Sequence, residues 1–226
     1  MSTHISALRA LSRLLEYPDA TLRAHALELL PAIEGAAGIS SERRAALCCL
    51  LNDIAHGDPY ETEARYVETF DRGRSTSLHL FEHVHGDARE RGQAMVDLAM
   101  TYEQAGLFMR EGELPDHLAV VLEFASTQPE AQALSFLGEM EHILAGLFSA
   151  LQKRSSPYAE VIAAVMELAH LPVQARSVSA DAPLDEAWAE PAAFDGCSTS
   201  GQSKPGEAQP IRIVRKTPPV SQGVTA

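Results

Sequence analysis

Cysteine is scarce in this sequence, with three residues among 226. Cys48 and Cys49 are adjacent and Cys197 is distant. They therefore form neither a disulfide framework nor the two-residue spacing of metal and redox motifs. We expect reduced thiols in a cytoplasmic protein, with at least one of Cys48 and Cys49 buried as a small apolar side chain.

Several motifs and segments are also missing. The sequence contains no G-x-x-x-x-G-K-[ST] phosphate loop, no G-x-G-x-x-G dinucleotide motif and no G-x-S-x-G turn of serine hydrolases. Its longest stretch without charged residues, 142–152, is too short to span a membrane. Arg9 and Arg13 stand where a signal peptide would have its apolar core. We expect a soluble cytoplasmic chain that does not insert into a membrane.

Basic residues are outnumbered, and only three of the 18 are lysines. With 31 acidic residues, the chain has a formal net charge of −13. An acidic surface repels phosphate backbones, so nucleic acid is not an expected partner. The same surface attracts basic partners over a distance.

Strand-forming residues are few, since Val and Ile total 20 against 61 for Ala and Leu. This balance favours helices. We therefore predict an all-α fold, a compact bundle of seven to eight helices. Pro31 is expected to kink or shorten the second helix. Apolar residues spaced by three and four, with their flanking caps, predict the helices at 5–16, about 20–34, from a cap at Ser40 or Ser41 to Gly57, 59–70, 87–109, 115–125, 129–151 and 156–168.

The helical pattern ends after Pro172. Residues 177–226 hold six of the 13 prolines, and 197–226 carry four basic residues and one acidic residue. We predict a helical domain over 1–176 and a Pro-, Gly- and Ser-containing C-terminal extension over 177–226. Its last part, 197–226, is expected to be a disordered, flexible tail.

A histidine-rich segment offers the strongest sign of enzymatic chemistry. His79-Leu-Phe-Glu82-His83 fits the H-x-x-E-H pattern, in which two histidines hold zinc and the glutamate acts as a base. A small metal-dependent hydrolase that uses these three residues is therefore an alternative function. Gly86 follows within one helical turn, which favours a polar surface segment. The expectation is no enzymatic activity, no metal and no other cofactor.

Four segments together resemble the nitrate reductase delta subunit family, the NarJ-type molybdenum cofactor assembly chaperones. They are YVETF at 66–70, DRGRSTSLHLFEHVHGDARERGQAMVDL at 71–98, ELPDHL at 113–118 and LDEAWAEPAAF at 184–194. The E-x-P-D-H element within 113–118 is also found in the wider TorD and DmsD chaperones. The resemblance extends over about residues 5–195 and implies a TorD-like helical bundle.

This resemblance implies a chaperone for nitrate respiration and assimilation that is not part of the finished enzyme. Such proteins bind the leader-like N-terminal segment of the apo catalytic (alpha) subunit in the cytoplasm, a form of unfolded protein binding. They permit insertion of molybdenum cofactor and iron–sulfur clusters before the enzyme attaches to the membrane. Molybdenum cofactor biosynthesis proteins are a further class of partner that the resemblance allows.

The resemblance also implies a peptide-binding site. Asp116 and His117 fall on a pair implicated in leader recognition, and Tyr66 and Phe70 fall on an aromatic pair that faces the same groove. Without the resemblance, Asp116 would be an acid in the first turn of a helix that starts at Pro115, and the two aromatic residues would belong to the core. Segment 77–83 differs from relatives with other targets and would tune the groove through Leu78, His79, Phe81, Glu82 and His83.

Overall fold

The computed structural model describes residues 3–84, 89–110 and 112–175. Regular structure in these ranges is helical, apart from one isolated antiparallel bridge between His79 and His117. The all-α prediction is therefore confirmed. The predicted extension, 177–226, lies outside the described residues, so the division of the chain at 176 stays a prediction.

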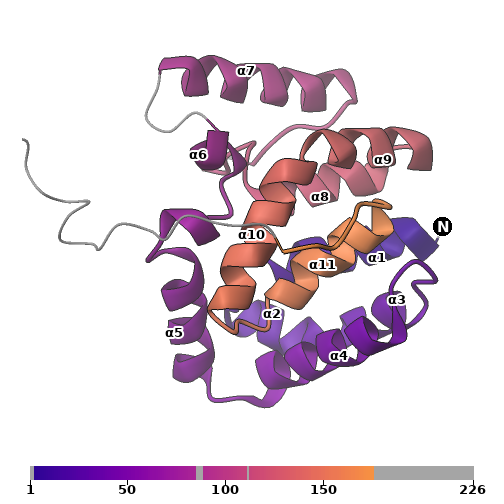
Figure 1. The fold of residues 1–226 in the computed structure, drawn as a ribbon, viewed down its shortest axis with the longest axis vertical. Helices are drawn as coiled ribbons and strands as arrows, with labels where there is room; N and C mark the ends of the chain where they lie inside the picture. The colour runs from indigo at the N-terminus through magenta and orange to yellow at the C-terminus, as the bar shows by residue number, and fades with distance from the viewer. Residues whose placement is uncertain (1–2, 85–88, 111, 176–226) are drawn as a thin grey trace, which may run out of the picture. The chain divides into compact units, whose positions relative to one another are not determined.

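The described part of the chain contains helices α1 to α11, more than the seven or eight predicted (Figure 1). Two predicted helices are each broken, and a short additional helix forms in the histidine-rich segment. In chain order the elements are α1 (Thr3–Leu14), α2 (Ala20–His25), the 3-10 helix η1 (Ala26–Leu29), α3 (Leu30–Glu34), α4 (Ser41–His56), α5 (Pro59–Phe70), the 3-10 helix η2 (Arg74–Thr76), α6 (Leu80–Val84), α7 (Arg89–Gln104), α8 (Leu118–Thr127), α9 (Glu130–Glu139), α10 (Glu141–Lys153) and α11 (Ala159–Leu168).

The core forms where α1 packs against α8 and α11, and where α10 packs against α11. Leu8, Leu11 and Leu15 of the first helical segment step by three and four, and all three are fully buried. The hydroxyl of Ser12 donates a 2.7 Å hydrogen bond to the Ala119 carbonyl, which ties α1 to the first turn of α8. The start of α8 is therefore held on a rigid scaffold.

Pro31 interrupts the predicted helix 20–34, as expected. Proline has no N–H to donate to the carbonyl of residue 27, and its ring crowds that carbonyl. The chain forms the 3-10 helix η1 immediately before Pro31. The N–H of Leu30 then bonds to the Leu27 carbonyl, three residues back. The α-helical pattern resumes only at α3.

The predicted single helix over 129–151 is wrong. It is divided at Met140 into α9 and α10, whose axes are bent by 67°. Met140 has φ −97° and ψ 5°, and its N–H bonds to carbonyls two and three residues back. The bend leaves both Leu137 and Leu144 fully buried. The apolar spacing continues through the break, so the sequence pattern does not reveal it.

The described helices are shorter than the roughly 20 residues that a membrane span needs. None of them is individually long and apolar enough to cross a membrane; α9 and α10 meet the length and composition only when they are taken together despite the bend.

The helix that was predicted from Pro115 begins later, at Leu118. Upstream, α7 ends at Gln104 rather than at 109, and Gly106 follows with a φ of +79°. Glycine adopts this left-handed conformation readily and commonly terminates helices. The result is a connection between α7 and α8 in which Asp116 precedes the helix instead of lying in its first turn.

The expectation that Cys48 or Cys49 is buried is wrong. Cys48 is half-buried and Cys49 is exposed. The buried face of α4 consists of Leu47, Leu50, Leu51 and Ile54. Each residue advances about 100° around a helix, so a side chain one or two positions after Leu47 points away from that face.

Cys49→Ser is expected to change the free energy of unfolding by less than about 0.5 kcal/mol, because the side chain is exposed. Leu51→Ala, on the buried face of the same helix, should lower it by about 2–5 kcal/mol. Denaturant unfolding measures both values. A cost for Cys49→Ser as large as that for Leu51→Ala would contradict the described orientation of α4.

Candidate functional site

The side chain of Asp116 is fully buried. Its Oδ2 accepts a 3.2 Å hydrogen bond from the backbone N–H of Phe81, and its Oδ1 lies 3.2 Å from Nδ1 of His79. The guanidinium of Arg91 on α7 approaches Oδ2 to 3.8 Å. One carboxylate therefore joins α6, α7 and the start of α8.

Backbone hydrogen bonds also join residues 78–80, at the start of α6, to residues 116–118, at the start of α8. The N–H of Leu80 donates to the Asp116 carbonyl at 3.0 Å, and the N–H of Leu118 donates to the Leu78 carbonyl at 2.9 Å. His79 and His117 face each other between these bonds. Extended backbone of this kind cannot be helical, which explains why α8 starts after Asp116 and not at Pro115.

His117 rather than Asp116 caps α8. Its Nδ1 accepts a 3.3 Å hydrogen bond from the N–H of Ala119. This bond satisfies one of the free N–H groups that every helix start leaves. The interpretation of Asp116 as a simple first-turn acid is therefore wrong, because its carboxylate is bonded to α6 instead.

The pKa values of the two imidazoles, His79 and His117, are shifted in opposite directions. The hydrogen bond to Asp116 raises the pKa of His79, although partial burial acts against it. Burial lowers the pKa of His117, and the nearby His79 charge adds to this effect. The two rings are 5.1 Å apart. These opposite shifts favour protonation of His79 beside Asp116 and a neutral His117, whose Nδ1 lone pair accepts the helix-cap bond.

Further bonds hold the segment that contains α6. Arg74 donates from Nε and a terminal nitrogen to the Glu82 carbonyl at 3.0 and 2.7 Å. Nε2 of His83 lies 2.9 Å from the Ser77 carbonyl. Leu78 is buried, whereas five neighbouring side chains are half-buried. We call these five the α6 surface: His79, Phe81, Glu82, His83 and His117.

Tyr66 and Phe70 lie in a different cluster. Both rings are buried, at 7% and 5% exposure, and they pack on Tyr158 with ring-centre distances of 5.8 and 4.9 Å. The Tyr66 hydroxyl donates a 2.7 Å hydrogen bond to the Leu15 carbonyl. The pair thus anchors α5 on the residues that follow α1 and precede α11. Among the described residues, the ring contacts of Tyr66 and Phe70 are with each other, Tyr17 and Tyr158, and not with Asp116 or His117.

The H-x-x-E-H residues do not converge. His79 is bonded to Asp116, His83 to the Ser77 carbonyl, and Glu82 lies 3.4 Å from Arg91. Within residues 3–84, 89–110 and 112–175, no three His, Cys, Asp or Glu side chains are grouped to hold a metal ion. No observation in these ranges favours the hydrolase alternative.

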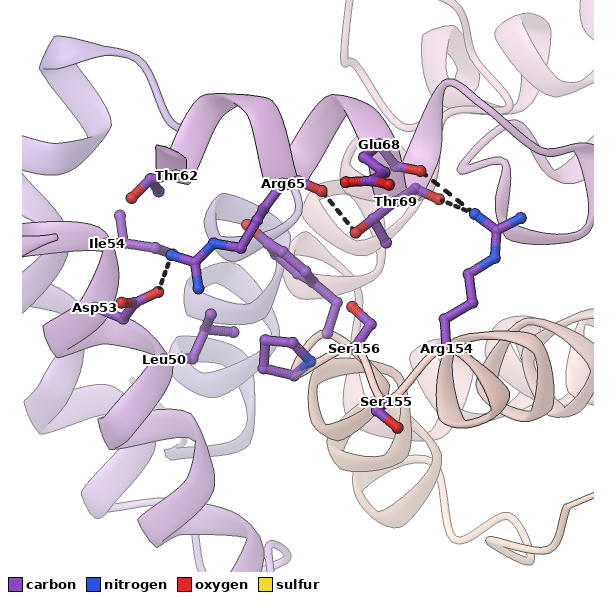
Figure 2. A pocket seen from close by; sticks show the side chains of 12 residues that line it. Leu50, Asp53, Ile54, Thr62, Arg65, Glu68, Thr69, Arg154, Ser155 and Ser156 are labelled. Carbon is purple, nitrogen blue, oxygen red and sulfur yellow. Dashed lines mark hydrogen bonds and ion pairs between the residues drawn. The ribbon is translucent and has the colours of Figure 1, made fainter. Parts of the chain in front are cut away.

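A cavity of about 450 Å³ lies between α4, α5 and the turn that joins α10 to α11 (Figure 2). Sequence reasoning missed it because no motif marks it. Three of its charged side chains are engaged: Arg65 lies 2.6 Å from Asp53, and Arg154 donates to carbonyls at the end of α5. Two buried hydroxyls in its lining, on Thr62 and Ser156, have no hydrogen-bond partner among the described residues. Such a cavity suits ordered water or a small polar group.

Asp116→Asn is expected to lower the pKa of His79, because an amide oxygen stabilises a protonated imidazole less than a carboxylate does. NMR titration of the histidine ring signals measures this change. Glu139→Gln, on α9, provides a matched loss of one carboxylate away from the site. An unchanged pKa for His79 in Asp116→Asn would contradict the described contact.

The free energy of unfolding should depend on pH through the protonation of His79. The raised pKa of His79 means that its contribution is fully present below its ordinary value of 6.5 and is lost as pH rises through the folded-state pKa. The stability difference between wild type and Asp116→Asn should therefore shrink as pH rises through that range. His117, with a lowered pKa, contributes in the opposite direction, above its unfolded pKa.

Comparison with known proteins identifies the family. Residues 36–164 match the model described as nitrate reductase delta subunit. The chain is 44% identical over 189 residues to the nitrate reductase molybdenum cofactor assembly chaperone NarJ of Escherichia coli K12, covering 79% of this chain and 80% of that protein. It is 37% identical over 180 residues to the probable nitrate reductase molybdenum cofactor assembly chaperone NarW of the same organism (79% and 74%). It is 35% identical over 153 residues to the probable nitrate reductase molybdenum cofactor assembly chaperone NarJ of Bacillus subtilis 168 (68% and 82%).

Each of these three relatives is matched over two thirds or more of both chains, and the family model spans the α6 segment and Asp116. This chain belongs to the nitrate reductase delta subunit family.

Proposed function

We propose that this chain is a chaperone for the assembly of a nitrate reductase and that it acts by binding, not by catalysis. The observation that carries the proposal is family membership: relatives that match most of this chain are named as nitrate reductase molybdenum cofactor assembly chaperones. The acidic composition and the half-buried side chains of the α6 surface support a binding role.

The proposed client is the N-terminal segment of the apo catalytic subunit, and the α6 surface is its proposed binding site. Phe81 and His83 are half-buried, and large apolar side chains are exposed at Val84 on α6 and at Phe108 and Leu114 in the connection between α7 and α8. Apolar contacts with an acidic rim are suited to an amphipathic, basic helix. Such a segment would be attracted by the net negative charge of the chain.

Leu78, Tyr66 and Phe70 have positioning roles in this proposal, and Asp116 supports the α6 surface from beneath. Leu78 and Asp116 are buried, and their bonds hold α6 against the start of α8. Tyr66 and Phe70 anchor α5 in the core and do not touch the client. In the proposed sequence of events, the chaperone holds the subunit in the cytoplasm until molybdenum cofactor and iron–sulfur clusters are inserted, and then leaves before membrane attachment.

Deleting the gene for this protein should leave the cell with nitrate reductase subunits that are inactive. Cells that lack the gene would be assayed for nitrate reduction and for molybdenum content of the purified catalytic subunit. Expression of the wild-type chain should restore both. Full activity and molybdenum content in its absence would contradict the proposed function.

Phe81→Ala is expected to weaken binding of a peptide from the N-terminus of the catalytic subunit by about tenfold, because it removes the half-buried aromatic ring of the α6 surface. Calorimetric titration measures the dissociation constant. Tyr60→Ala, which also removes an aromatic ring but on α5, where that ring is 83% exposed, should leave the dissociation constant unchanged. Equal effects of the two variants would mean that the peptide does not bind at the α6 surface.

A further inference from the structure

Two carboxylates on different segments already converge on a guanidinium. A terminal nitrogen of Arg91 lies 3.4 Å from Oε1 of Glu82 on α6 and 3.8 Å from Oδ2 of Asp116. The Asp116 side chain is fully buried, whereas those of Glu82 and Arg91 are 30% and 25% exposed. The arrangement is a guanidinium site whose inner wall is buried and whose outer wall borders solvent.

Arg91 fits this site loosely. Tight charge-assisted hydrogen bonds between a guanidinium and a carboxylate are about 2.7–2.9 Å long, and both distances here are longer. Burying the Asp116 carboxylate nevertheless favours hydrogen-bond donors and positive charge nearby, and on its other side Oδ1 lies 3.2 Å from Nδ1 of His79. The site therefore favours a cation, but Arg91 makes neither of its two contacts at ideal length.

The helix that carries Arg91 is only lightly attached. From Arg91 to Gln104, Tyr102 is the one buried side chain, while Val96 and Met100 are 52% and 49% exposed. The Tyr102 hydroxyl donates a 2.8 Å hydrogen bond to the Pro115 carbonyl, which holds the far end of α7. Releasing Arg91 would therefore free the near end of α7 without exposing a large apolar surface.

We propose that Glu82 and Asp116 form a binding site for an arginine of the client peptide, and that Arg91 occupies it as an internal substitute until the client arrives. The proposal rests on the proposed function, because it names the chemical group that the α6 surface recognises. The client guanidinium enters from the exposed Glu82 side and displaces Arg91. Arg91 thereby lowers the apparent affinity, since only molecules in which it has left can bind.

Arg91→Gln removes this internal competitor. The expected result is a dissociation constant for the catalytic-subunit peptide that is three- to tenfold lower than in wild type, measured by calorimetric titration. Arg110→Gln is the matched control: it removes a positive charge from the same α7–α8 region, where Arg110 is 79% exposed and lies 3.9 Å from Glu113. This variant should bind like wild type.

A second peptide, in which every arginine is replaced by glutamine, tests whether the gain depends on the guanidinium. It should bind Arg91→Gln no more tightly than wild type. If thermal unfolding shows that Arg91→Gln does not fold, Arg91→Lys replaces it, since an ammonium keeps the charge but not the planar fork; a tightening of at least twofold is then expected.

The outcomes separate this inference from the proposed function. Equal or weaker binding by folded Arg91 variants, with clear binding by wild type, overturns the exchange and leaves the chaperone role intact. A gain that persists with the arginine-free peptide also overturns it. Peptide binding by neither wild type nor variant overturns both the exchange and the proposed client site.

Discussion

The buried carboxylate of Asp116 is the interaction on which the arrangement of the candidate site depends. A carboxylate removed from water is unfavourable unless hydrogen bonds and positive charge surround it. Here the partners are the N–H of Phe81, the imidazole of His79 and the guanidinium of Arg91, none of which lies on the segment of Asp116 itself. Satisfying one side chain therefore fixes α6 against the start of α8.

The polar cluster around Asp116 and the aromatic cluster of α5 have different structural roles. Tyr66, Phe70 and Tyr158 are buried together and attach α5 to the main core. The core in turn holds the first turn of α8 through Ser12 and Ala119. In the proposed function, recognition falls to the half-buried α6 surface, and Glu82 of that surface lies 3.4 Å from Arg91 of the lightly attached α7. A rigid support beneath an adaptable surface is consistent with the proposed binding and later release of a peptide.

Much of the fold was predictable because helical periodicity is a local property. Asp58 and Pro59 marked the start of α5, and Pro31 marked the interruption before α3. The bend at Met140 was not predictable, since the apolar spacing is the same on both sides of it. The exposure of Cys49 was missed because an apolar run does not specify which of its members faces the core.

The site was predictable only in part, because its bonds join residues far apart in the sequence. The resemblance identified Asp116 and segment 77–83 as important, but not that one would be bonded to the other. The hydrogen bond from Phe81 to Asp116 spans 35 positions and uses a backbone N–H, which leaves no trace in the residue pattern. The same holds for Arg91, whose role depends on where α7 lies.

The most direct test of the account is an NMR map of peptide binding on the intact chain. Backbone amide signals would be recorded as the peptide from the catalytic subunit is added. The account predicts that the largest shifts occur over residues 77–84 and 113–119, with further shifts at the start of α7 near Arg91. Shifts concentrated instead around the cavity between α4, α5 and the α10–α11 turn, with the α6 segment unchanged, would contradict it (Figure 2).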